Sequence, residues 1–278
     1  MIRIKKFLNR LVKVVSLSAV HALKNSNRDF RTIWDLSLKH FPSFADHFSF
    51  RITDPETEAR IRFLVVVETL FIKESIGCIK KDSLTYADIG DSDGAVRILL
   101  TELFSSKELD TIGVNLQPSA VEKMRKLGLK AICADAMELG KQNVAYDVVS
   151  VFETLEHLPD PIGFLTNIKP IVNERLVLSV PFIRKSKIGL RYLDSGWPEG
   201  QTPTIENQHI FELSPLDWKK IILHAGWAPR REKIFKQFPE NTYHRFILQP
   251  YWRYISFEGF WFVELEKNDT YSSQYSIE

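Results

Sequence analysis

Four side chains in the second half of the chain have the types and spacing of a reactive site. Glu153, Glu156 and His157 lie three and four positions apart, so one helical turn would place all three on a single face. His209 follows much later in the sequence. Two carboxylates and two imidazoles can fill four positions around a divalent ion; the carboxylates admit Mg²⁺, and the imidazoles favour Mn²⁺, Fe²⁺ or Zn²⁺. Without a metal, His157 or His209 would serve as a general base.

A glycine-bearing turn lies upstream of these residues. Residues 84–89 have the composition of a buried strand, and the sequence Gly-Asp-Ser-Asp-Gly follows at 90–94. Apolar residues at helical spacing then occupy 95–104. A strand, a turn where glycine lets a ligand approach the backbone, and a helix N-terminus form the nucleotide-binding corner of doubly wound α/β domains. Such turns also simply connect a strand to a helix, so this one needs further support.

Strands and helices alternate over the rest of the chain. The predicted strands are 84–89, 111–116, 129–134, 146–152, 175–182 and 260–266, and the predicted helices are 95–104, 118–126, 160–168 and 214–225. Most of these strands are almost continuously apolar, which is typical of strands buried on both faces. The pattern therefore predicts an α/β fold in which helices cover both faces of a largely parallel sheet.

The first 28 residues contain basic side chains and no acid. Their apolar residues Ile4, Phe7, Leu8, Leu11 and Val15 fall on one helical face. This pattern predicts either a basic amphipathic helix on an anionic membrane surface or a helix that packs on its own domain. Polar residues interrupt the run, which excludes a transmembrane span.

The division of the chain follows from a second helical signal. Asp54-Pro55-Glu56 predicts a helix start and Gly77 its end, around a strongly apolar run at 62–72. We therefore divide the chain into an N-terminal helical segment, residues 1–80, and an α/β domain, residues 81–278.

Composition limits the function classes. The chain has 278 residues and a net charge of +2, which does not favour DNA binding. Its two cysteines, Cys78 and Cys133, form no disulfide framework or metal cluster in the sequence. These features indicate a cytoplasmic protein, on the inner face of the membrane if the basic helix binds lipid.

Several motifs, in order, resemble class I S-adenosylmethionine-dependent methyltransferases. Residues 88–94 resemble the first motif of that family, and 133–136 resemble its third-strand motif. Residues 146–161 resemble the fourth-strand region of the ubiquinone and small-molecule methyltransferase branch, and 178–181 and 208–227 resemble later segments. The resemblance implies a Rossmann-like, doubly wound seven-stranded sheet with an antiparallel last strand, and S-adenosylmethionine as the methyl donor.

The resemblance also implies roles for single residues. The cofactor-binding positions would be Asp88, Gly90, Gly94, Asn115, Asp135 and Ala136. Asp88 and Gly90 would flank the methionine part of the cofactor, Asp135 would accept from the adenine amino group, and Glu153 would lie at the mouth of the pocket.

Two positions depart from the family pattern. Ser92 stands where the family usually has glycine, and Asn115 stands where an acid usually binds the ribose hydroxyls. An acid restored at position 115 should therefore tighten binding, unless a neighbouring group has adapted to the neutral side chain. These departures leave open a methyltransferase fold that has lost catalysis and serves as an interaction module.

The four reactive residues have their own resemblance. Glu153, Glu156 and His157 with the distant His209 are similar to the metal site of small-RNA 2′-O-methyltransferases, and the first three look like that of metal-dependent quinol O-methyltransferases. An ion there would bind the acceptor oxygen and lower its pKa. The same Glu-His-Leu-Pro-Asp-Pro run also occurs in methyltransferases that use no metal, where it shapes the turn after the fourth strand.

Two predicted insertions, residues 183–207 and 238–257, would form the acceptor site. Both combine basic and aromatic residues, which suits an anionic, ring-bearing acceptor such as a phosphorylated or acidic sugar. The same aromatics would alternatively only pack the insertions on the sheet. RNA is disfavoured because acids interrupt the positive runs. We therefore expect O-methylation of a small-molecule or glycan-type acceptor.

Overall fold

The computed structural model describes residues 17–47, 55–105, 108–139, 141, 144–188, 209–237 and 258–275. The helices with their bounds are α2 (Arg28–His40), α3 (Phe44–His47), α4 (Pro55–Gly77), α5 (Ala95–Leu103), α6 (Pro118–Lys126), α7 (Ala136–Leu139), α8 (Pro161–Asn167) and α9 (Pro215–His224). The strands of the large sheet are β1 (Leu84–Ile89), β2 (Leu109–Asn115), β3 (Ala131–Cys133), β4 (Tyr146–Phe152), β5 (Val172–Phe182), β8 (Trp227–Lys236) and β9 (Gly259–Lys267). A further helix covers residues 17–26.

Seven strands form one sheet in the order β3-β2-β1-β4-β5-β9-β8. The strands from β3 to β5 are parallel, and β9 is antiparallel to both of its neighbours. The predicted fold class, including its antiparallel last strand, is confirmed. The order reverses between β1 and β4, so the carboxyl ends of these two strands flank the crevice where ligands bind in such sheets.

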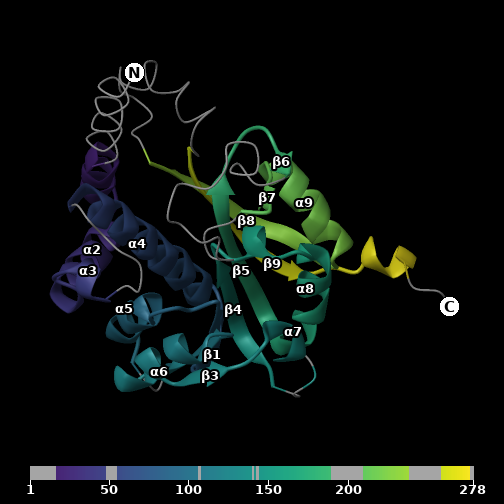
Figure 1. Ribbon diagram of the computed structural model, residues 1–278, viewed down its shortest axis with the longest axis horizontal. Helices are drawn as coiled ribbons and strands as arrows, with labels where there is room; N and C mark the ends of the chain where they lie inside the picture. The colour runs from purple at the N-terminus through teal and green to yellow at the C-terminus, as the bar shows by residue number, and fades with distance from the viewer. Residues whose placement is uncertain are drawn as a thin grey trace, which may run out of the picture.

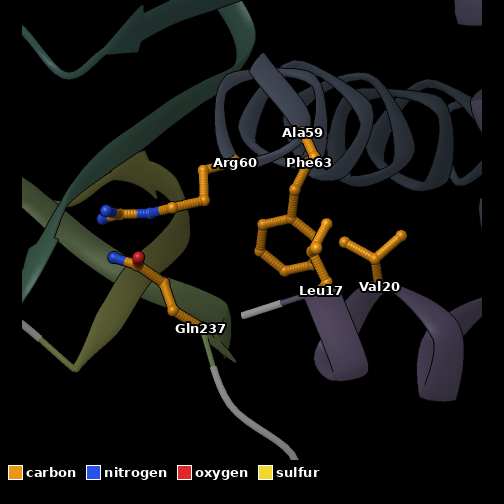
Figure 2. Close-up of a pocket in the computed structure, with 6 residues that line it drawn as sticks. All are labelled: Leu17, Val20, Ala59, Arg60, Phe63 and Gln237. Atoms are coloured by element: carbon orange, nitrogen blue, oxygen red, sulfur yellow. The ribbon is translucent and has the colours of Figure 1, made fainter. Parts of the chain in front are cut away.

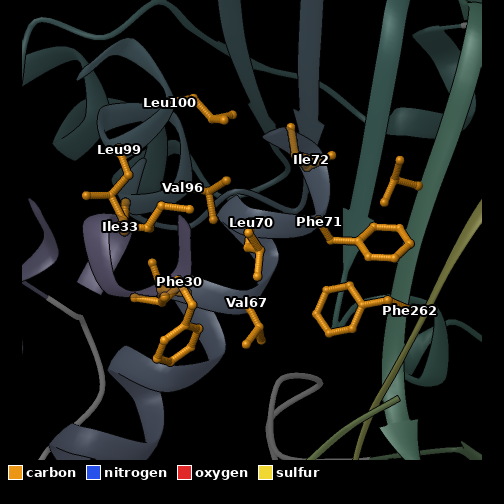
Figure 3. Close-up of a cluster of buried hydrophobic side chains, with 14 of the residues drawn as sticks. Phe30, Ile33, Val67, Leu70, Phe71, Ile72, Val96, Leu99, Leu100 and Phe262 are labelled. Atoms are coloured by element: carbon orange, nitrogen blue, oxygen red, sulfur yellow. The ribbon is translucent and has the colours of Figure 1, made fainter. Parts of the chain in front are cut away.

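Helices cover both faces of this sheet (Figure 1). On one face, α2, α4 and α5 share an apolar core with Tyr86 of β1 and Phe262 of β9; Figure 3 shows Phe71 of α4 facing Phe262. On the other face, α8 and α9 bury Phe164 and Trp218 against the strands. The central strands are therefore covered on both sides, which explains their nearly continuous apolar sequences.

The helical residues before the sheet pack closely together. Arg62 of α4 is buried, and its guanidinium donates to the carbonyl oxygens of Ser37 and Phe41 at 2.7 and 2.8 Å and to Glu58 at 2.9 Å. These bonds satisfy the free carbonyls at the end of α2 and tie it to α4. The helix predicted to start near residue 54 and end at Gly77 is observed as α4; the boundary at residue 80 stays a prediction.

One strand of the large sheet was missed by the sequence analysis. β8 pairs with β9, and half-buried and exposed residues alternate over 231–234, with the charged Lys233 half-buried and the apolar Ile234 exposed. Its Arg231 donates to Glu264 and to Ser75 at 3.2 and 2.9 Å. Because β8 is an edge strand rich in charge, it lacks the apolar run that identifies the buried strands. A short pair, β6 (Lys187–Ile188) and β7 (Phe211–Glu212), was also missed.

Three predictions lie wholly or largely outside the described residues. They are the basic helical face over residues 1–16, the insertion at 183–207, of which only 183–188 are described, and the insertion at 238–257. Within the described ranges, no helix is long and apolar enough to cross a bilayer.

Candidate active site

The glycine turn after β1 packs directly on the turn after β4. Gly90 and Gly94 have φ values of 87° and 77°, in the left-handed region that favours glycine. A Cβ atom on Gly90 would lie 2.5 Å from the Oγ1 atom of Thr154. No other residue type fits there without displacing Thr154. The two turns are therefore in direct contact at the carboxyl edge of the sheet.

A buried ion pair holds the shape of the glycine turn. The carboxylate of Asp91 accepts from the backbone N–H of Gly94 at 2.6 Å and pairs with Nε of Arg97 at 2.6 Å. Arg97 is fully buried and also donates to the carbonyl oxygen of Lys130. This pair, which the sequence analysis missed, holds the glycine turn against the helix that follows it. An arginine on the apolar face of the following helix was the signal for it.

Asp88 ends β1 inside the protein. Its carboxylate accepts a 2.6 Å hydrogen bond from Oγ of Ser150, which in turn lies 2.6 Å from the hydroxyl of Tyr86. Burial, and next the charge of Asp91, raise the pKa of Asp88 well above its ordinary value. Because no cation pairs with it in the described residues, the carboxylate is available to a positively charged or hydrogen-bond-donating ligand.

A second buried acid reaches this corner from the N-terminal helices. Glu68 of α4 is 6 % exposed, and burial, followed by the charges of Glu153 and Asp88, raises its pKa well above the ordinary value. His47 of α3 lies with its Nε2 atom 3.6 Å from Oδ1 of Asp93 in the glycine turn. The sequence analysis did not select either residue, although Glu68 is the lone acid in an apolar run.

The ends of β2 and β3 carry Asn115 and Asp135 next to each other. Asn115 pairs with Cys133 in the sheet, and Asp135 lies two residues after the end of β3. The Nδ2 atom of Asn115 donates to the carbonyl oxygen of Asp91 at 3.0 Å, and its Oδ1 accepts from the N–H of Gln117 at 2.7 Å. Asp135 is exposed and accepts from the N–H of Met137 at the start of α7, where Ala136 is the first residue. Asn115 thus braces the glycine turn with a donor that an acid lacks.

We predict that Asn115→Asp destabilises the protein and does not tighten cofactor binding. A carboxylate would lose the bond to the Asp91 carbonyl and face that oxygen at close range, which should cost about 1–2 kcal/mol. The unfolding temperature of the ligand-free protein should fall by roughly 2–6 °C. Asn167→Asp, at the exposed end of α8, is the matched control and should change nothing. If Asn115→Asp binds the cofactor more tightly and is as stable as wild type, this prediction is wrong and an acid at position 115 improves the cofactor site.

The side chain of Glu153 does not lie on the same helical turn as Glu156 and His157. Glu153 adopts φ 44°, and a 3-10 helix, η1 (Leu155–His157), starts after it. Its carboxylate accepts from Oγ of Ser179 on β5 at 2.9 Å. Burial raises the pKa of Glu153 to about 8, against the effect of that hydrogen bond. The expectation that Glu153, Glu156 and His157 share one helical face was wrong, because the left-handed residue turns the Glu153 side chain toward β5.

Glu156, His157 and His209 do converge. Their potential ligand atoms lie within 4.8 Å of one another, and the two imidazole rings meet edge to face with centroids 4.8 Å apart. The N–H of Ile210 donates to the carbonyl oxygen of Glu156 at 2.8 Å, which brings the distant histidine back to the turn after β4. Glu153 is outside this cluster of three.

Glu156 is the buried member of the cluster. It is 1 % exposed, and neither carboxylate oxygen has a hydrogen-bond partner among the described residues. Nε2 of His157 lies 3.9 Å from Oε1 of Glu156. Burial, and next the charge of Glu153, raise the pKa of Glu156 well above its ordinary value. A carboxyl in this position requires a proton, an imidazolium or a metal ion beside it.

Comparisons with known proteins identify the family and the fold. Residues 74–232 match a family model described as a methyltransferase domain. No curated protein matches the chain by sequence.

Solved structures of similar fold include three with low sequence identity. The Burkholderia thailandensis 1,6-didemethyltoxoflavin-N1-methyltransferase, bound to its namesake compound and S-adenosylhomocysteine, has a TM-score of 0.52 at 11 % identity, covering 88 % of this chain and 90 % of its own. An O-methyltransferase from a trans-AT PKS multienzyme of Brevibacillus brevis, in complex with S-adenosylhomocysteine, has a TM-score of 0.51 at 15 % identity, and the match covers 77 % of this chain and 76 % of its own. The [4+2]-cyclase SpnF has a TM-score of 0.55 at 15 % identity, and the match covers 86 % of this chain and 94 % of its own.

Proposed function

The chain belongs to the class I S-adenosylmethionine-dependent methyltransferases, and from this premise we propose that it methylates a hydroxyl oxygen of a small-molecule or glycan-type acceptor. S-adenosylmethionine carries a methyl group already activated on a sulfonium, so alignment of the acceptor does most of the remaining work. A hydroxyl must in addition lose its proton, and the chain has groups placed for that step.

The observation that carries the proposal is the pair of imidazoles beside the buried carboxyl of Glu156. His157 or His209 would take the proton from the acceptor hydroxyl, since an imidazole titrates near neutral pH. The resulting imidazolium would lie next to Glu156, whose carboxylate is costly to bury without a cation.

The cofactor would lie across the carboxyl ends of β1, β2 and β3. In this proposal Asp88 and Gly90 contact its methionine part, Asn115 and Asp135 its nucleoside, and the Asp91–Arg97 pair keeps the turn in position. Glu68, Asp88 and Glu153 are neighbouring buried acids: burial, and next the charges of Glu153 and Asp88, raise the pKa of Glu68. A pocket rich in buried carboxyls is suited to a sulfonium cation, because the ligand charge offsets their mutual repulsion.

The similar structures support the small-molecule part of the proposal. The Burkholderia thailandensis enzyme is bound to the small compound that names it, and the Brevibacillus brevis enzyme is an O-methyltransferase. The [4+2]-cyclase shows that the same fold also supports another reaction, so the assignment of a hydroxyl acceptor depends on the histidine cluster.

A metal-assisted form of this reaction is the second candidate. The unpartnered carboxylate of Glu156 and the two convergent imidazoles fit a divalent ion with one oxygen and two nitrogen ligands from the protein. Such an ion would lower the pKa of the acceptor hydroxyl. Glu156, His157 and His209 would hold it, and Glu153 would stay with Ser179.

Thermal unfolding in the presence of S-adenosylmethionine or S-adenosylhomocysteine tests whether the protein binds the cofactor that the proposal requires. A ligand at about 100 times its dissociation constant should stabilise the protein by about 2.7 kcal/mol. For a chain of this size, that corresponds to an increase of roughly 5–10 °C in the unfolding temperature. If neither ligand shifts the transition at millimolar concentration, the fold serves as a non-catalytic interaction module.

A further inference from the structure

Glu68 is a buried carboxyl to which the proposed function gives no individual role. It lies in the middle of α4 and is 6 % exposed. Its carboxylate has no hydrogen bond and no ion pair with another side chain in the described part of the protein, and burial raises its pKa well above the ordinary value. A carboxyl that loses water without gaining a partner is costly in either protonation state, so Glu68 is suited to a ligand that supplies hydrogen-bond donors.

α4 begins at the edge of the sheet where the parallel strands end. Near its start, Arg60 and Phe63 line a small space together with Gln237, the residue directly after β8 (Figure 2). Because β8 and β5 are both antiparallel to β9, β8 ends at the same edge as the parallel strands. Near the end of α4, Ser75 donates to Glu264 of β9 at 2.7 Å, and Glu264 lies away from that edge, opposite the middle of β5. Residues earlier in α4 are therefore closer to the edge that carries the glycine turn.

Aromatic packing places Glu68 close to the turn that follows β4. Phe71, one helical turn after Glu68 on the same face, packs on Phe262 of β9 with ring centroids 5.4 Å apart (Figure 3). Phe262 in turn packs on Phe152, the last residue of β4, at 6.0 Å. Glu68 lies one turn closer to the carboxyl edge than Phe71. Glu153 directly follows Phe152, so the two acids lie beyond the same row of rings.

The charges that act on Glu68 come from the ends of β1 and β4 and from the turns that follow them. After burial, the charges of Glu153 and Asp88 contribute most to its raised pKa, and two acids of the glycine turn come next. In that turn, Asp91 pairs with Arg97 at 2.6 Å. Glu68, Asp88 and Glu153 form no ion pair within the described ranges. These three neighbouring acids therefore favour a ligand that brings positive charge.

We propose that Glu68 accepts hydrogen bonds from the α-ammonium of the methionine part of S-adenosylmethionine, so that α4 completes the methyl-donor site. The cofactor has two cationic groups, the ammonium and the sulfonium, and both belong to its methionine part. Only the ammonium has N–H groups, and an unpartnered carboxylate requires hydrogen-bond donors as well as positive charge. The assignment rests on the position of the cofactor in the proposed function, which puts the methionine part at Asp88 and Gly90.

Two ligands that differ by one group test this assignment on the full chain. They are S-adenosylhomocysteine and an analogue in which a hydrogen replaces its amino group. Calorimetric titration of wild type should show at least about tenfold weaker binding of the analogue, because it lacks the ammonium. Equal affinity for the two ligands overturns the proposal, and this comparison requires no variant. If wild type binds neither ligand, the proposed function itself is wrong.

A substitution locates the contact. Glu68→Gln keeps the size of the side chain and removes its charge, so S-adenosylhomocysteine should bind about tenfold more weakly, whereas the analogue should bind as it does to wild type. Glu122→Gln, the same change at an exposed residue of α6 paired with Lys126, should alter neither affinity. Wild-type affinity of Glu68→Gln for S-adenosylhomocysteine, or an equal loss for both ligands, refutes the role of Glu68 and leaves the proposed function standing.

The stability of the variant separates a binding role from a structural one. Glutamine resembles the uncharged carboxyl that burial favours at position 68, so ligand-free Glu68→Gln should unfold within about 2 °C of wild type. A large fall in the unfolding temperature, with the same loss of affinity for both ligands, would show that Glu68 only supports the fold.

Discussion

His209→Ala should abolish divalent metal binding while leaving cofactor binding intact. Of the three proposed ligands, His209 comes from a separate segment of the chain, and its loss leaves only Glu156 and His157, which are adjacent in sequence. Loss of one of three protein ligands typically reduces affinity by at least about 100-fold, since two adjacent residues cannot enclose an ion. Titration of the purified protein with Mn²⁺ or Zn²⁺, followed by calorimetry, measures this directly and needs no acceptor.

The histidine at position 224 provides the matched control. His224 is exposed and hydrogen-bonded to Tyr275, so His224→Ala should bind the ion as wild type does. Treatment with a chelator should remove the ion and leave the thermal shift with S-adenosylhomocysteine unchanged, because the ion serves the acceptor. If wild type shows no saturable binding of either metal, the metal-assisted form is excluded and the imidazoles remain as general bases.

Asp88→Ala should weaken cofactor binding at least tenfold, which corresponds to about 1.4 kcal/mol. Asp88 is the buried acid at the end of β1, and Ser150 orients its carboxylate with a 2.6 Å bond. A hydrogen bond to a charged group contributes about 1.5–3 kcal/mol when its geometry is fixed in this way. Calorimetric titration with S-adenosylmethionine gives the affinity of each variant.

The folded state should tolerate this change. The substitution removes an acid whose pKa is raised by its burial and next by the charge of Asp91, so the ligand-free variant should unfold at or above the wild-type temperature. Asp110→Ala, at the opposite end of β2 and paired only with exposed Lys130, should keep wild-type affinity. A correctly folded Asp88→Ala variant with wild-type affinity would remove Asp88 from the cofactor site.

The elements that the sequence predicted correctly are those whose signal is local. The apolar strand at 146–152 coincides with β4, and Ser214 and Asp160 cap α9 and α8 as their positions before proline indicate. Gly90 and Gly94 adopt the positive φ that a tight strand-to-helix turn requires. In each case the responsible atoms belong to neighbouring residues, so periodicity and turn chemistry are sufficient to identify them.

The edge strand β8 could not be identified from its local sequence pattern. Its charged residues are explained by partners distant in the chain, such as the pair of Arg231 with Glu264. A strand of this kind is stabilised by its neighbour in the sheet and has little apolar periodicity of its own. The sequence therefore left it out, although the family resemblance implied a seventh strand.

For the candidate site, the sequence alone identified the candidate residues and their order along the chain, while the direction of each side chain was decided by the tertiary structure. The spacing of Glu153, Glu156 and His157 suggested one face, but the left-handed backbone at Glu153 and the hydroxyl of Ser179 on a neighbouring strand separate the first acid from the others. His209 joins Glu156 only because a backbone bond from Ile210 closes a long loop. Contacts of this kind depend on how distant segments pack, and sequence spacing carries no information about them.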